Sequence, residues 1–128
     1  MTGVQTCALP IYGFKVLDEL GWKYITLITW IKDKVGLGQY FRGTTEHCIF
    51  ATKGHSTYAS EKGVSGFFAK REEHSAKPPQ MYRMIERVSG GPYLEVFARK
   101  TRDGWSSWGN EIEGGLHTAE PKQRGWFQ

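Results

Sequence analysis

Helix-like and strand-like apolar segments are interleaved along the chain, and their order constrains the fold more than any other feature. Residues 13–20 carry apolar side chains at helical spacing, and Gly21 follows as a residue that commonly ends a helix. A second helix is predicted to open at Pro78 and to end at Gly90-Gly91. Its apolar face is formed by residues three or four positions apart, namely Met81, Ile85 and Val88, with Met84 beside them.

The other apolar segments have the composition of strands. They are rich in β-branched and aromatic residues and cover 22–32, 46–53, 66–70 and 93–97. The loops that separate them contain glycine and are expected over 33–45, 55–65 and 99–115. Because strands are interleaved with helices, the pattern predicts an α/β sheet with crossover connections.

Composition sets further limits. A length of 128 residues allows one domain, and a formal net charge of +4 is compatible with a polyanionic partner. No apolar stretch approaches the roughly 20 residues of a bilayer span, and no secretory signal is visible. Cys7 and Cys48 make neither a disulfide framework nor a zinc-site spacing, so no metal is expected and a reducing cytoplasm is the predicted compartment.

The first eleven residues differ from the rest of the chain. They contain no charged residue, whereas all 30 charged residues of the chain lie at later positions. The segment Thr2 to Ile11 also looks like the translation of a sequencing adapter. We therefore expect residues 1–11 to be an artefact outside the fold and the chain to be a C-terminal fragment; the alternative is a short disordered leader. Residues 117–128 show no pattern and are expected to be a frayed tail.

Ligands of open α/β sheets bind beyond the carboxyl ends of the strands, which directs attention to 33–46, 72–77 and 99–111. Lys77 stands at the expected N-cap of the second helix, where lysine cannot accept the free backbone N–H groups. It is a candidate for binding a phosphate or a carboxylate, and the alternative is a solvated lysine. His74 is either a ligand contact or a hydrogen-bonded structural histidine.

Two further groups of polar residues follow strands. Arg99, Asn110 and Glu111 border the loop after the last strand, where an amide and a carboxylate can bind ribose hydroxyls; alternatively they form turns. Trp105 and Trp108 of the same loop are expected to pack. The second group, Tyr40, Phe41, Arg42 and Glu46, can hold a backbone phosphate and stack on a base. The alternative is an exposed ion pair or a solvated loop.

Taken in order, short motifs form a series that resembles one family. They are Trp30-x-Lys32, Gly36-Leu37-Gly38-x-Tyr40-x-Arg42, Glu46, Lys53-Gly54, Glu73-His74-Ser75-x-Lys77-Pro78, Tyr82-x-x-Ile85-Glu86, Leu94-Glu95-x-Phe97-Ala98-Arg99 and Gly104-Trp105-x-x-Trp108-Gly109-Asn110-Glu111. The series resembles the C-terminal half of the adenine N(6) methyltransferases related to the catalytic subunit of the eukaryotic mRNA methyltransferase, in the bacterial and phage version. The resemblance covers about residues 14 to 113.

The resemblance implies a partial Rossmann-like fold that uses S-adenosylmethionine, with residues 12–116 forming the C-terminal part of the domain. It implies that Lys77 contacts the cofactor and that Arg99, Asn110 and Glu111 contact its ribose and adenine region. It also implies that Tyr40, Arg42 and Glu46 lie near the target adenosine. The expected polyanion is DNA first and RNA second.

One departure from the family concerns the mechanism. The family's Asp-Pro-Pro-Trp motif is absent, because Pro78-Pro79 follows Lys77 and none of Asp18, Asp33 and Asp103 precedes a proline. In the family this aspartate aims the exocyclic amine of adenine at the methyl group. We therefore expect a truncated, inactive copy that lacks the N-terminal catalytic half. The alternatives are a non-catalytic subunit that binds nucleic acid or a partner, and a fragment that does not fold.

Overall fold

The computed structural model describes residues 2–5, 10–55, 61–72 and 76–120, with backbone only for 2–5. The chain divides into two compact units, Met1–Gly90 and Gly91–Gln128, and each is considered by itself. None of the described helices has the length and apolar character needed to cross a bilayer.

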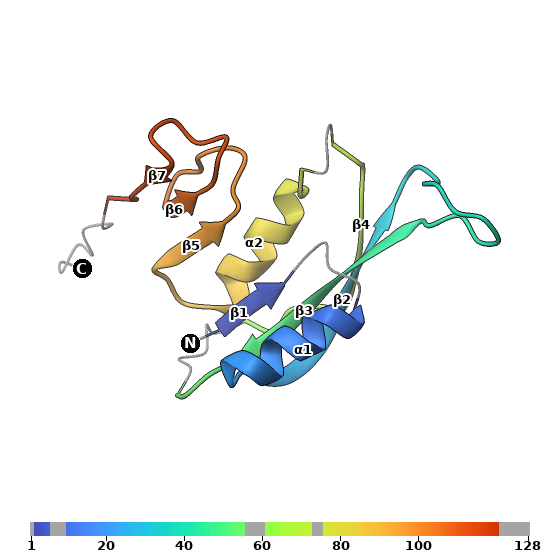
Figure 1. Ribbon diagram of the computed structural model, residues 1–128, viewed down its shortest axis with the longest axis horizontal. Helices are drawn as coiled ribbons and strands as arrows, with labels where there is room; N and C mark the ends of the chain where they lie inside the picture. Colours follow the sequence, from blue (N-terminus) through green and yellow to red (C-terminus); the bar gives the residue numbers. More distant parts are fainter. Residues whose placement is uncertain (1, 6–9, 56–60, 73–75, 121–128) are drawn as a thin grey trace. The chain divides into compact units, whose positions relative to one another are not determined.

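The first unit is built on a mixed four-stranded sheet with the order β1-β3-β2-β4 (Figure 1). The strands are β1 (Thr2–Gln5), β2 (Lys23–Lys32), β3 (Thr45–Thr52) and β4 (Gly66–Ala69). Only β2 and β4 run parallel, and β3 is antiparallel to both β1 and β2. The sheet is therefore not the parallel kind that crossovers produce, because the connection between β2 and β3 contains no helix.

One helix packs on each face of this sheet. Neighbouring residues of a strand point to opposite faces, so Cys48 and Ile49 of β3 belong to different layers. Ile49 and Ala51 pack with Leu17 of α1 (Pro10–Leu20). Cys48 and Ile28 pack instead with Met81 of α2 (Pro79–Val88). Strands β2 and β3 therefore have apolar contacts on both faces.

The predicted end of the first helix is confirmed. Gly21 has a φ of +67°, and its N–H donates to the Asp18 carbonyl at 3.2 Å while that of Trp22 donates to the Leu17 carbonyl at 2.9 Å. These two bonds form a Schellman motif, and Trp22 packs against the cluster around Leu17. The helix begins at Pro10, three residues before the segment 13–20 whose apolar spacing predicted it, because proline suits the first helical turn.

The segment 1–11, which we expected to lie outside the fold, contributes both β1 and the start of α1. The expectation relied on the lack of a side-chain pattern. Strand pairing uses backbone N–H and C=O groups, so Thr2–Gln5 can pair with the edge of β3 without such a pattern. The adapter origin of the segment is not tested by this result.

The predicted second helix is present, but both of its ends differ. Its N-cap is Pro78 rather than Lys77, and Pro79 opens the helix. The helix ends at Val88, before Gly90-Gly91, and the backbone N–H of Ser89 donates to the Ile85 carbonyl at 2.8 Å. The predicted core face is confirmed for Met81, which is buried. Lys77 therefore precedes the helix and does not cap it.

The second unit is a three-stranded sheet with the order β5-β6-β7 (Figure 1). Its strands are β5 (Tyr93–Val96), β6 (Trp105–Trp108) and β7 (Leu116–His117). The region 99–115 was predicted to be a loop, yet it contains β6, which pairs in parallel with β5. The indole of Trp105 is buried and stacks on Tyr93 at 4.8 Å between ring centroids, as expected of a packing residue, whereas Trp108 is about half exposed.

Candidate functional site

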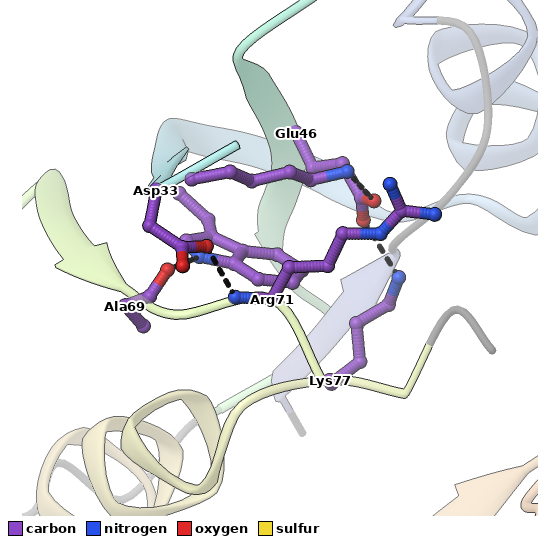
Figure 2. A network of polar contacts seen from close by, with 7 residues as sticks. Asp33, Glu46, Ala69, Arg71 and Lys77 are labelled. Atoms are coloured by element: carbon purple, nitrogen blue, oxygen red, sulfur yellow. Dashed lines mark hydrogen bonds and ion pairs between the residues drawn. The ribbon is translucent and has the colours of Figure 1, made fainter. Parts of the chain in front are cut away.

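One carboxylate lies between two lysines in the first unit. Glu46 of β3 receives Lys32 Nζ on Oε1 at 2.5 Å and Lys77 Nζ on Oε2 at 2.7 Å (Figure 2). Lys32 ends β2, and Glu46 faces Trp30 across the β2–β3 ladder. The side chains of Lys32 and Lys77 are only 17% and 11% exposed. Lysines are seldom so buried without a counter-charge, which Glu46 supplies here.

The charge state of Glu46 follows from two opposed effects. Burial raises the pKa of its carboxyl, and the hydrogen bonds from Lys32 and Lys77 lower it. The hydrogen bonds and the charge attraction of the two lysines together outweigh burial, so the pKa of Glu46 is lowered from its ordinary value of 4.5. The carboxylate is therefore ionised at neutral pH. With both lysines protonated, the three side chains together carry a charge of +1.

The end of β2 is tied to the segment that follows β4. The indole N–H of Trp30 donates to the Ala69 carbonyl at 2.8 Å, and the backbone N–H of Arg71 donates to Asp33 Oδ1 at 2.8 Å. That backbone hydrogen bond lowers the pKa of the Asp33 carboxyl. Figure 2 shows the Arg71 side chain pointing to the side where Glu46 and Lys77 meet. These hydrogen bonds therefore fix the backbone at Arg71, whose guanidinium is a third cation near Glu46 (Figure 2).

The predicted substrate residues Tyr40, Arg42 and Glu46 do not form one cluster. Tyr40 and its neighbour Phe41 are each 93% exposed in the β2–β3 connection. Arg42 Nε donates to the Gly36 carbonyl at 3.1 Å, within the same connection. Glu46 lies in β3 and pairs with the two lysines. The structure therefore separates an exposed aromatic loop from a largely buried ionic network.

The predicted residues Arg99, Asn110 and Glu111 do come together in the second unit. With Phe97 and Ala98 they line a cavity of about 220 Å³. Arg99 Nε lies 3.4 Å from Glu111 Oε1. The side chains of both residues are about half exposed, so their pairing contributes little to stability.

Backbone contacts hold the two sides of this cavity together. The N–H of Ala98 donates to the Trp108 carbonyl at 2.9 Å, and that of Gly109 donates to the Gly115 carbonyl at 3.1 Å. A Cβ on Gly109 would lie 2.2 Å from the Ala98 carbonyl oxygen, so no larger residue fits. Phe97, which precedes Ala98, has a φ of +63°, rare for a non-glycine residue.

Several residues of these sites were not predicted from the sequence. Lys32 received no role, although it lies two residues after Trp30 and therefore on the same face of β2. Gly109 belongs to the motif series, but its close approach to the Ala98 backbone arises from the folded loop and leaves no local signal in the sequence. His74 lies outside the described residues. Among the described residues, no group of three or more His, Cys, Asp or Glu side chains is placed to hold a metal ion.

Comparison with known proteins decides the family. Residues 1–111 match the family described as MT-A70. The chain belongs to the MT-A70 family. The family resemblance expected from the ordered motifs is thereby confirmed, and the match includes the first eleven residues. A bacterial or phage origin stays a prediction.

Curated relatives match most of this chain but little of their own length. The chain is 30% identical to the N(6)-adenosine-methyltransferase MT-A70-like protein of Arabidopsis thaliana, covering 83% of this chain and 16% of that protein. It is 27% identical to the human N(6)-adenosine-methyltransferase catalytic subunit METTL3, over 88% and 20% respectively. A stretch of 40 residues is 48% identical to human N(6)-adenine-specific methyltransferase METTL4, over 30% and 8%. The chain thus spans about a fifth or less of these relatives.

Proposed function

We propose that this chain forms part of an enzyme that transfers a methyl group from S-adenosylmethionine to the exocyclic amine of adenine in a nucleic acid. Membership of the MT-A70 family carries this proposal, and the cavity bordered by Arg99, Asn110 and Glu111 supports it. In this proposal the mixed α/β architecture is part of a Rossmann-like domain.

RNA is the nucleic acid that we propose first. The names of the Arabidopsis relative and of human METTL3 specify adenosine, which is a ribonucleoside. They give no support to DNA as the main partner, which the sequence alone had placed first. The name of METTL4, which matches a shorter stretch, specifies adenine rather than adenosine. We therefore propose DNA as the second nucleic acid to be tested.

The residues around the cavity suit the nucleoside part of the cofactor. The Glu111 carboxylate can accept hydrogen bonds from two ribose hydroxyls, and the Asn110 amide can both donate and accept. Arg99 Nε lies 3.4 Å from Glu111 Oε1, close enough to orient the carboxylate. A volume of about 220 Å³ is below the roughly 300–1,000 Å³ of pockets that enclose drug-sized ligands, so the cavity encloses only part of the molecule.

The first unit contributes separately to the proposed chemistry. Lys77 would offer its ammonium group to the cofactor, and Glu46 would hold that group in place. Tyr40 and Arg42 would contact the target strand, because an exposed ring can stack on a base and a guanidinium can bind a phosphate. S-adenosylmethionine supplies an electrophilic methyl group when bound. The residues named here would bind and orient the cofactor and the target strand. None of them belongs to an Asp-Pro-Pro motif.

That missing motif leads us to propose that the 128-residue polypeptide alone does not transfer a methyl group. It also favours a second candidate function, a non-catalytic subunit that binds nucleic acid or a catalytic partner. The two candidates differ in cofactor use, since a binding subunit needs no S-adenosylmethionine.

Calorimetric titration with S-adenosylhomocysteine tests the cofactor site. We expect the wild-type chain to bind S-adenosylhomocysteine. The affinity of Glu111→Ala should be lower by about tenfold or more. Glu113→Ala is the matched control, because Glu113 is exposed in the same loop and does not line the cavity. A folded wild-type chain that binds no S-adenosylhomocysteine would favour the binding subunit. Methyl transfer by this polypeptide to an adenine-containing RNA or DNA strand would refute its inactivity.

A further inference from the structure

Lys32 has no role in the proposed function, yet it shares the carboxylate that holds Lys77. Each lysine occupies a different oxygen of Glu46, at 2.5 Å for Lys32 and 2.7 Å for Lys77. A carboxylate bound by Lys77 alone can rotate and offer both oxygens to that ammonium. With Lys32 on Oε1, only Oε2 faces Lys77. The charge and the orientation that Lys77 meets therefore depend on a residue at the end of another element.

The surroundings restrict Lys32 to this position. Its Nζ lies 5.1 Å from the centre of the Trp30 ring, a distance suited to a cation–π contact. The Trp30 indole is itself fixed by its hydrogen bond to the Ala69 carbonyl. Lys32 thus lies between the buried, hydrogen-bonded Trp30 ring and the Glu46 carboxylate, and its side chain is only 17% exposed.

We propose that Lys32 is a positioning residue that acts through Glu46 on Lys77 and so sets the affinity of Lys77 for an anionic oxygen group. The proposal rests on the proposed function in one respect, namely that Lys77 meets a ligand. Lys32 pairs with one oxygen of Glu46 and adds a second positive charge, so the three side chains together carry a charge of +1. Without Lys32, one positive charge is lost from beside Glu46 and Lys77, so an anion is attracted less strongly.

The anionic group has two sources in the proposed reaction. It is either the carboxylate of the cofactor or a phosphate of the nucleic-acid strand, and both have oxygen atoms that accept from an ammonium. S-adenosylhomocysteine carries a carboxylate and no phosphate, whereas a short RNA carries phosphates. Titrations with these two probes therefore distinguish the sources.

The experiment compares four forms of the full chain: wild type, Lys32→Met, Lys32→Arg and Lys23→Met. Lys23 begins the same strand at its opposite end and is exposed, so its substitution removes the same charge without touching Glu46. Affinities for S-adenosylhomocysteine and for a short adenine-containing RNA are measured by calorimetry. Nuclear magnetic resonance follows the titration of the Glu46 carboxyl and the response of the Lys77 ammonium to inorganic sulfate.

We expect Lys32→Met to lower the affinity for one of the two probes by about tenfold. This is the loss expected when one nearby charge is removed from a partly solvated site. Lys32→Arg should restore most of the affinity, and Lys23→Met should have little effect. The pKa of Glu46 should rise in Lys32→Met, because one of its two lysine hydrogen bonds is lost; this shows that the variant is folded and locally altered.

Several outcomes would overturn the proposal. One is a Lys32→Met chain that binds both probes and sulfate as well as wild type does. Another is an equal loss in Lys23→Met, which would indicate net charge alone. A wild-type Lys77 that responds to no anion would also refute it. In one further case, wild type binds neither probe, but its Lys77 responds to sulfate more strongly than in Lys32→Met. The proposed function then fails for this chain, while the role of Lys32 is supported.

Discussion

Gly109 is the residue whose replacement should disturb the proposed cofactor cavity most directly. A Cβ at this position would lie 2.2 Å from the carbonyl oxygen of Ala98 and 2.9 Å from its backbone nitrogen. Ordinary contact begins at 3.4 Å, so Gly109→Ala must push the two segments apart by more than 1 Å. Both neighbouring atoms belong to the backbone and cannot rotate away.

The cost can be worked out from these contacts. Overpacking against a rigid neighbour costs roughly 1–3 kcal/mol. The shift also strains the bond from the buried Ala98 N–H to the Trp108 carbonyl, whose loss costs about 1–3 kcal/mol. The sum, about 2–6 kcal/mol, is comparable with the whole stability of about 2–6 kcal/mol expected for the 38 residues from Gly91 to Gln128. We therefore expect Gly109→Ala to unfold this unit and abolish binding at Glu111.

Amide hydrogen exchange gives the test, because it reports each unit separately. The Ala98 amide should lose its protection in Gly109→Ala, whereas amides of β2 and β3 should keep theirs. Gly114→Ala is the control, since its Cβ meets nothing within 4 Å and its φ of +71° costs only about 1–2 kcal/mol. An Ala98 amide as well protected in Gly109→Ala as in wild type would refute the reasoning.

Three further predictions concern the first unit. Glu46 has a lowered pKa, so its contribution to stability is complete above pH 4.5 and is lost as the pH falls through the folded-state value. The stability advantage of wild type over Glu46→Gln in urea unfolding should therefore shrink as the pH falls through that window. Trp30→Phe removes the indole N–H that bonds to Ala69 and should lower the free energy of unfolding by about 2–3 kcal/mol in urea. Gly21→Ala imposes a φ of +67° on alanine and should lower the free energy of unfolding by about 1–2 kcal/mol. In the same assay, Gly43→Ala should change it by less than about 0.5 kcal/mol, because a Cβ at Gly43 meets no atom within 4 Å.

The sequence predicted the elements of the first unit other than β1, because the signals of those elements are local. Gly21 ends α1 through two backbone bonds that its own conformation permits, and β-branched residues mark β2. The ends of α2 were predicted less well, since proline can act as N-cap as well as first residue. Strand β6 was missed because Trp105 to Trp108 contains two serines and only four residues. Its pairing with β5 is a long-range contact that no local pattern encodes.

The candidate sites differ in how far the sequence could predict them. Arg99, Asn110 and Glu111 were named together from the motif series, and the structure places them around one cavity. The expectation that Glu46 belongs with Tyr40 and Arg42 followed from their closeness in sequence. A strand that starts at Thr45 separates them, because it fixes Glu46 in the ladder opposite Trp30 and leaves the preceding loop exposed.

The position of Lys77 depends on packing that lies outside the ionic network itself. Glu46 and Cys48 are two residues apart in β3 and therefore share a face of the sheet. Met81 lies four residues after Lys77, and its Sδ is 3.9 Å from Cys48 Sγ in the buried core. The contact between Met81 and Cys48 thus sets where the start of α2 meets β3, and that in turn brings Lys77 to Glu46. A core contact without charge determines which ammonium the carboxylate can reach.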